Sequence, residues 1–197
     1  MNIFYVDSCP IVSAKSLCDQ HVSKMTVETA QMLSTVCRNN RGVLSSVKSI
    51  NSKGKEIIKE RYLLLDRGEY DGMWMKDRCQ IYWGAYPKHP CTIWAGQSAS
   101  NWRWLVSHGM ALGAEFQKRY KKVHKSHAVI SLCKSIGVDL PEGLTPVPQA
   151  MPDTYKQSCP IEAYRAYYLG EKMSWARWNY TNPPKWTTST RSSNGRT

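Results

Sequence analysis

The pattern of residues 13–38 constrains the fold most, because it predicts one long helix with a polar stripe along the edge of its apolar face. At about 100° per residue, a seven-residue step returns almost to the same direction around a helix axis, so His21 and Glu28 share a face two turns apart. Lys24 and Gln31 fall within roughly 80° of that direction. The stripe therefore carries an imidazole, a carboxylate, an amine and an amide on one side of the helix.

Two interpretations of this stripe remain open. On a solvent-facing side of the helix, Lys24 and Glu28 would form an ordinary i, i+4 ion pair. Apolar side chains flank the stripe, however, where an amphipathic helix would normally continue its apolar face. These flanking residues are Leu17, Met25, Met32 and Val36. Their positions place the stripe at the edge of the core.

The strongest signal in the composition is positive charge. The chain of 197 residues has a formal net charge of +12, and it is long enough to bury a core within one domain. An excess of this size attracts polyanions, which makes nucleic acid the first candidate partner and an acidic membrane surface the second. The sequence has no apolar run of about 18 residues and no signal-peptide pattern, so we expect an intracellular protein without a membrane span.

Cysteine usage indicates a reducing compartment. The seven cysteines are odd in number and form no Cys-x-x-Cys pair, which is typical of free thiols. Three pairs of potential zinc ligands lie close in the sequence, but none has a second pair at the spacing of a structural zinc site. These pairs are Cys18 with His21, His89 with Cys91, and His124 with His127. Glycine-rich phosphate loops are also absent, so we expect neither a metal nor another cofactor.

Strand patterns are sparse, and the sequence predicts a mainly α, compact fold with a short extended segment at residues 2–7. Residues 39–55 are rich in Ser, Asn, Gly, Lys and Arg, which predicts a basic loop or insertion. Its cations can reach phosphates or simply keep the loop soluble. They are Arg41, Lys48, Lys53 and Lys55. A helix is expected at residues 56–65.

We expect one domain over residues 1–186 and a flexible tail at residues 187–197, which is rich in Ser, Thr, Asn, Gly and Arg. The most regular helix pattern starts near residue 98 and ends at Tyr120. Gly109 and Gly113 lie one turn apart in it, so another helix can approach closely there.

Two basic segments suit contact with nucleic acid. Residues 118–125 contain five cations and a histidine, more than a helix C-terminus needs for its dipole. A later helix, beginning at Pro160, repeats cations and rings at three- and four-residue steps, a pattern that can grip phosphates and stack on an exposed base. Those residues are Arg165, Tyr168, Lys172 and Trp175. Part of this surface must be core, because most of the eight tryptophans will pack inside the domain.

Residues 17–21, Leu-Cys-Asp-Gln-His, with Glu28 beyond them, resemble the first long helix of the pyrimidine-dimer DNA glycosylase of T-even phage, endonuclease V. In that enzyme a catalytic glutamate has the same spacing. The likeness continues more weakly at residues 89–120 and 175–186. Nearly the whole chain also resembles a broad group of small phage proteins. The shared motifs are Asn2-Ile3-Phe4-Tyr5, His21-Val22-x-Lys24-Met25-x-x-Glu28, His89-Pro90, Lys122-Val123-His124-Lys125-Ser126, Pro148-Gln149-Ala150-Met151-Pro152 and Ala163-Tyr164-Arg165.

The resemblance to endonuclease V implies a compact helical domain that bends duplex DNA and extrudes a nucleotide. It also implies attack on the sugar C1′ by the N-terminal amine of a threonine exposed after Met removal. This chain departs there, because Asn2 is a residue before which Met1 is usually retained, and no threonine lies within the first ten positions. A terminus blocked by Met cannot form the Schiff base, which argues against glycosylase and lyase chemistry.

Phages with hypermodified thymine contain amino acid:DNA transferases that resemble DNA glycosylases, and we expect this chain to act similarly. In this reaction an amine displaces phosphate from 5-phosphomethyluracil in duplex DNA. The partners would be double-stranded DNA and an amino acid, for example glycine, in the cytoplasm of an infected bacterial host. Two alternatives remain: a pyrimidine-dimer glycosylase with AP lyase activity, and a non-enzymatic DNA-binding protein in which the stripe is structural.

Under the transferase hypothesis, the predicted site has three parts. The catalytic residues are His21, Glu28 and Lys24, with either His21 or Glu28 as the base that deprotonates the amine. The residues expected to bind the substrate base are Gln31, His89, Trp94, Gln149 and Tyr155. Those expected to bind DNA phosphates are Lys121, Lys122, His124, Lys125, Arg165 and Lys172.

Overall fold

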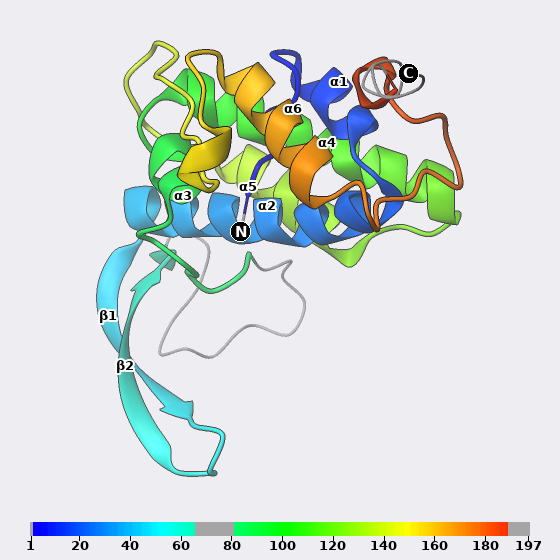
Figure 1. The fold of residues 1–197 in the computed structure, drawn as a ribbon. Coiled ribbons are helices and arrows are strands. Elements are labelled where there is room, and N and C mark those ends of the chain that lie inside the picture. Colours follow the sequence, from blue (N-terminus) through cyan, green and yellow to red (C-terminus); the bar gives the residue numbers. More distant parts are fainter. Residues whose placement is uncertain (1, 66–80, 189–197) are drawn as a thin grey trace, which may run out of the picture.

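The computed structural model describes residues 2–65 and 81–188 and confirms a mainly α fold (Figure 1). The helices are α1 (Pro10–Ser16), α2 (Asp19–Arg41), α3 (Pro90–Ala95), α4 (Ala99–Tyr120), α5 (Lys125–Ile136) and α6 (Pro160–Glu171). The strands β1 (Val43–Ile50) and β2 (Glu56–Leu63) form an antiparallel pair, and η2 (Asp153–Tyr155) and η3 (Lys185–Thr187) are short 3₁₀ turns. No helix in these two ranges is long and apolar enough to cross a membrane.

Helix α2 organises the helical body. It packs against α3, α4 and α5, and α1 packs against α4. The predicted close approach at Gly109 and Gly113 is confirmed. A Cβ at Gly109 would lie 2.6 Å from the side chain of Thr29 on α2, and one at Gly113 would lie 2.6 Å from the ring of His127 on α5. Glycine is therefore needed at both positions for this packing.

The helix predicted at residues 13–38 is interrupted between α1 and α2. Leu17 and Cys18 are extended, and long-range hydrogen bonds bind their backbone groups instead of helical ones. Arg119 donates to the Leu17 carbonyl at 2.8 Å, and the Cys18 N–H donates to the Tyr168 hydroxyl at 3.0 Å. Tertiary contacts thus compensate the break, which periodicity alone cannot reveal.

The predictions of a loop at residues 39–55 and a helix at residues 56–65 are corrected by the β1–β2 hairpin. Val43 pairs with Leu63 and Ile50 with Glu56. The connecting turn is closed by Asn51, whose side-chain oxygen accepts the N–H groups of Lys53 and Lys55. The helix-forming residues of this segment follow strand pairing because cross-strand contacts outweigh local propensity.

Residues near both ends of the described chain are buried. Residues 2–6 bury their side chains in the body, but they form no strand, and the segment expected to be extended turns at Phe4, where φ is 45°. Thr187, the first residue of the predicted tail, is buried within η3. Residues 189–197 of that tail lie outside the described residues. The domain boundary at residue 186 stays a prediction.

Candidate active site

A cavity of about 420 Å³ lies beside the N-terminal half of α2, within the usual range of roughly 300–1,000 Å³ for small-molecule sites. Four parts of the chain meet there: the N-terminal segment, the first half of α2 with its polar stripe, the loop before η2, and the end of α6 with the turn that follows it. The lining residues are Asn2, Phe4, Gln20, His21, Lys24, Met25, Glu28, Ala150, Tyr167, Lys172 and Trp175. The predicted catalytic residues His21, Lys24 and Glu28 are therefore brought together.

Glu28 is held by the start of the chain. The peptide N–H of Asn2 donates to Glu28 Oε2 at 2.9 Å. The side chain of Asn2 fixes the same segment, because its oxygen accepts the N–H groups of Ile3 and Phe4 and its amide donates to the Ala150 carbonyl. Asn2 itself is 7% exposed. One carboxylate oxygen is thus oriented by a buried backbone donor.

The predicted ion pair between Lys24 and Glu28 is present, with Nζ 3.7 Å from Oε1. The two side chains differ in exposure, at 68% for Lys24 and 13% for Glu28. The stripe is therefore not an ordinary solvated helix face. It presents a largely buried carboxylate to the cavity and a solvent-exposed cation at the opening.

His21 is a buried, neutral group. Its ring stacks on Phe4 with centroids 4.4 Å apart, and the ring of Trp175 meets it edge to face at 5.1 Å. Burial is the largest cause that lowers the pKa of His21, followed by the charges of Lys172 and Lys24, to about 3. Near pH 7 this imidazole is therefore neutral and a poor base, and Glu28 is the carboxylate that lines the same cavity.

A hydroxyl fixes the tautomer of His21. The Tyr168 hydroxyl lies 2.8 Å from His21 Nδ1 and also accepts the Cys18 N–H. Burial raises the pKa of Tyr168, so its hydroxyl keeps the proton and can donate it to Nδ1. This network assigns the imidazole proton to Nε2. His21 can therefore donate one hydrogen bond without carrying charge.

Asp19, the first residue of the Asp-Gln-His motif, has a structural role. Arg119, fully buried on α4, lies 3.1 Å from Asp19 Oδ1 and also pairs with Glu115 at 3.1 Å. The other oxygen of Asp19 accepts the backbone N–H of Asn179 at 2.7 Å. This network joins the start of α2 to α4 and to the C-terminal segment, and so positions the turn of helix that carries His21.

None of the five predicted base-binding residues lines the cavity. Trp94 is 1% exposed and donates its indole N–H to the Thr145 carbonyl, so it belongs to the core and cannot stack on a base. His89 caps α3 by accepting the Cys91 N–H. Gln31 is half-buried on the next turns of α2.

The other two lie next to the cavity wall rather than in it. The amide of Gln149 bonds the backbone N–H and carbonyl of Gln157, which closes the loop before α6. The Tyr155 hydroxyl donates to Glu171 at 2.9 Å, and its ring packs on Tyr167. Both residues support the wall that Ala150 and Tyr167 present to the cavity.

The predicted phosphate-binding residues separate into two groups. Lys172 lines the cavity, with Nζ 4.6 Å from the centroid of the Tyr167 ring. Arg165 lies nearby but donates to the Val6 carbonyl at 2.9 Å and approaches Asp7 at 3.7 Å, which gives it a structural contact.

The remaining four lie where α4 passes into α5, and none lines the cavity. Lys121, Lys122 and Lys125 are exposed. His124 caps α5 by accepting the Ser126 N–H, and burial lowers its pKa. The three lysines remain available to a polyanion. The His124 ring is already engaged, because its Nδ1 atom accepts the hydrogen bond from α5.

Sequence reasoning missed several cavity residues. Asn2 and Phe4 belong to a motif shared with the phage proteins, yet nothing local indicates that they contact Glu28. Tyr167 was missed as well, although it lies within the series of rings and cations after Pro160. Trp175, which that series did include, borders the cavity and is 40% exposed.

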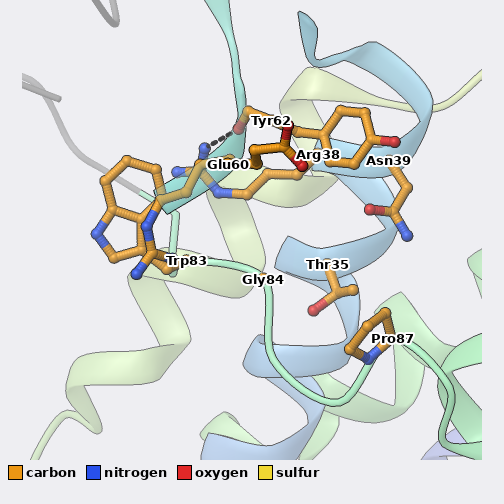
Figure 2. Close-up of a pocket in the computed structure, with 9 residues that line it drawn as sticks. Thr35, Arg38, Asn39, Glu60, Tyr62, Trp83, Gly84 and Pro87 are labelled. Carbon is orange, nitrogen blue, oxygen red and sulfur yellow. Dashed lines mark hydrogen bonds between the residues drawn. The ribbon is translucent and has the colours of Figure 1, made fainter. Parts of the chain in front are cut away.

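A second cavity, of about 460 Å³, lies at the base of the hairpin (Figure 2). Arg38 donates to the Tyr62 carbonyl at 2.7 Å, and its guanidinium lies 4.4 Å from the Trp83 ring centroid. Arg61 lies 4.5 Å from the same centroid. Among the described residues, no group of three His, Cys, Asp or Glu side chains could hold a metal ion here or elsewhere.

One comparison with known proteins found a family to which the chain is similar. The family model of pyrimidine dimer DNA glycosylases matches residues 1–128, which include Asn2, His21 and Glu28. No curated protein and no solved structure gives a match. The match covers more than half of the chain and includes the helix that carries the polar stripe. The chain belongs to the pyrimidine dimer DNA glycosylase family.

Proposed function

We propose that this chain binds duplex DNA, extrudes a thymine-derived nucleotide into the cavity beside α2, and transfers an amino acid to 5-phosphomethyluracil there. Membership of a glycosylase family supports an enzyme acting on DNA bases. The cavity has the requirements for a flipped base: concave shape, aromatic walls and cations. The co-substrate would be a small amino acid such as glycine, in a bacterial cell infected by a phage.

The observation that carries the proposal is the position of Glu28. Its carboxylate is largely buried and lies 2.9 Å from a nitrogen that is part of a peptide bond, because Met1 precedes Asn2 in the sequence. A peptide nitrogen cannot attack carbon. A carboxylate in this position therefore suits an external nucleophile, from which Glu28 would remove a proton.

The remaining groups fit amine-for-phosphate substitution. The amine nitrogen bonds to the 5-methylene carbon, the carbon–oxygen bond to phosphate breaks, and the amine proton passes to Glu28. Lys24 and Lys172 would stabilise the departing phosphate anion. The rings of Tyr167 and Trp175 would stack on the extruded base, and neutral His21, backed by the buried ring of Phe4, would donate a hydrogen bond.

A glycosylase with AP lyase activity is the second candidate, and the same contact favours it. If Met1 were removed, the nitrogen of Asn2 would become an α-amine about 3 Å from Glu28, a usual hydrogen-bonding distance. That amine could attack C1′ and form a Schiff base. Mass spectrometry of the N-terminus and borohydride trapping on dimer-containing duplex DNA separate the two candidates.

The deciding experiment incubates the protein with duplex DNA containing 5-phosphomethyluracil and a mixture of amino acids, followed by nucleoside mass spectrometry. With the wild type we expect a thymidine derivative whose 5-methylene carbon is bonded to the nitrogen of the amino acid, and none with Glu28→Gln. Absence of this nucleoside, together with cleavage of dimer-containing DNA and a trapped α-amine, would establish the glycosylase instead.

A further inference from the structure

The β1–β2 hairpin projects from the helical body at the C-terminal end of α2 (Figure 1). One of its faces is partly covered: Val47 and Leu63 point to that face and are each 3% exposed, although Val43 and Lys59 on the same face are exposed. The covered face secures the hairpin, because an isolated two-stranded ribbon is marginally stable in water. This packing does not explain the side chains on the other face of the hairpin.

That opposite face carries an exposed apolar stripe. The register places Leu44 opposite Tyr62, Lys48 opposite Ile58, and Ile50 opposite Glu56, so their side chains share one face. Ile50 is 75% exposed and Ile58 is 71% exposed. Leu44 and Tyr62 are also exposed on this face nearer the body, beyond the polar pair Ser46 and Glu60. Ile50 and Ile58 therefore form the main exposed apolar surface, and exposed apolar surface of this kind marks an interaction site.

Cations lie at the turn and on both faces of the hairpin. Lys53 and Lys55 are in the turn, and Lys59 lies beside Val47 on the face opposite the stripe. All three are exposed, and none pairs with a carboxylate in the described part of the chain. Lys48 pairs with Glu56 at 3.1 Å across the strands. Glu60, also exposed on the second strand, offsets part of this charge, and the excess that remains is positive and includes both lysines of the turn.

The hairpin is fixed at its base. Arg38, 2% exposed, donates to the carbonyls of Tyr62 and Tyr82, each at 2.7 Å. The Trp83 ring lies against the guanidinium group of Arg38 (Figure 2). The guanidinium group of Arg61 lies against the same ring. These contacts join the second strand to α2 and set the direction in which the hairpin leaves the body.

We infer that the hairpin is a DNA-binding arm that lies in a groove of the duplex beside the extruded nucleotide. The inference rests on the proposed function. Lysines of the arm contact phosphates, and Ile50 and Ile58 contact base edges such as thymine methyl groups. The occupant is duplex DNA because the free charge is positive and the family acts on DNA bases.

The dimensions suit this role. Arg41 lies thirteen positions after Glu28 on α2, which is about 20 Å along the helix at about 1.5 Å per residue. This distance equals the length of roughly six base pairs of duplex DNA. Each strand has eight residues and reaches about 27 Å. The major groove admits a two-stranded ribbon. One protein can thus hold the flipped nucleotide and a neighbouring groove together.

The test measures the affinity of purified full-length variants for a 5-phosphomethyluracil duplex across a salt series by fluorescence anisotropy. We expect Lys53→Ala with Lys55→Ala to reduce the slope of log K against log salt by about 1.8, since each phosphate contact contributes about 0.9. Lys15→Ala with Lys134→Ala, two exposed lysines outside the hairpin and the cavity, is the matched control. Its slope should stay at the wild-type value.

Apolar contact is tested by Ile50→Ser with Ile58→Ser, against Leu144→Ser as an exposed control. The double variant should bind at least about tenfold more weakly with an unchanged slope and an unchanged melting temperature. If the wild-type protein binds the duplex but the hairpin variants behave like their controls, the DNA-binding role of the hairpin is refuted while the proposed function is not. If the wild type does not bind duplex DNA, the proposed function fails as well.

Discussion

The peptide nitrogen of Asn2 lies 2.9 Å from Oε2 of Glu28, although 26 positions separate the two residues in the sequence. This bond ties the N-terminal segment to α2 and orients the carboxylate towards the cavity. Because Glu28 is fixed by a backbone donor rather than by a flexible side chain, it is preorganised for chemistry.

Replacing Glu28 with Gln should abolish turnover. The amide oxygen of Gln can still accept the Asn2 N–H, so the affinity for DNA and the melting temperature should stay close to the wild type. Rates and anisotropy measured on the same preparation test this. Glu162→Gln, an exposed position on α6, is the control and should retain activity. A large loss of melting temperature in Glu28→Gln would instead assign the residue to stability.

Removing Arg119 should destabilise the protein strongly. Arg119→Met leaves the carboxylates of Asp19 and Glu115 buried without their cation, which typically costs about 3–5 kcal/mol. Urea unfolding measures the free energy. Arg103→Met removes an exposed pair with Glu142 and should change stability little. Equal effects of the two substitutions would contradict the proposed importance of the buried network.

Stability should fall as the pH decreases from about 6.5 towards 3. Burial is the main cause that lowers the pKa of both His21 and His108 to about 3. Between these pH values the unfolded chain binds protons that the folded chain does not, so stability is complete above the unfolded pKa and is lost on acidification. Urea midpoints across this range test the prediction. Protonation of both rings near pH 6.5 in the folded protein, observed by NMR, would refute it.

The lysines between α4 and α5 should contribute to DNA affinity. Changing Lys121, Lys122 and Lys125 together to Ala should lower the salt slope by up to about 2.7, because each phosphate contact contributes about 0.9. Folding should be unaffected, since all three side chains are exposed. A salt slope equal to that of the wild type would remove this cluster from the interface.

Local patterns were sufficient for part of the site. The period of a helix alone places His21, Lys24 and Glu28 on one face, and the motif around Glu28 indicates the family. The contacts that give these residues their chemistry were not predictable, because they join distant positions. Asp19 and Arg119 lie 100 residues apart, and Tyr168 lies 147 residues from His21.

Other predictions failed where the same type of residue can serve either in the core or at a binding surface. Trp94 and Trp175 are both aromatic, yet only tertiary packing decides that the first is buried and the second borders the cavity. The hairpin was missed because its second strand contains good helix formers, and strand pairing depends on a partner in another segment of the chain.

Photo-crosslinking tests the central claim most directly, namely that an extruded nucleotide occupies the cavity beside Glu28. A duplex with 5-iodouracil in place of the target base is irradiated with the protein, and the linked peptide is identified by mass spectrometry. We predict cross-links to Tyr167 or Trp175, and their loss at position 175 in Trp175→Ala. Cross-links confined to Trp83 or to the hairpin would contradict the account, because the target base would then lie outside this cavity.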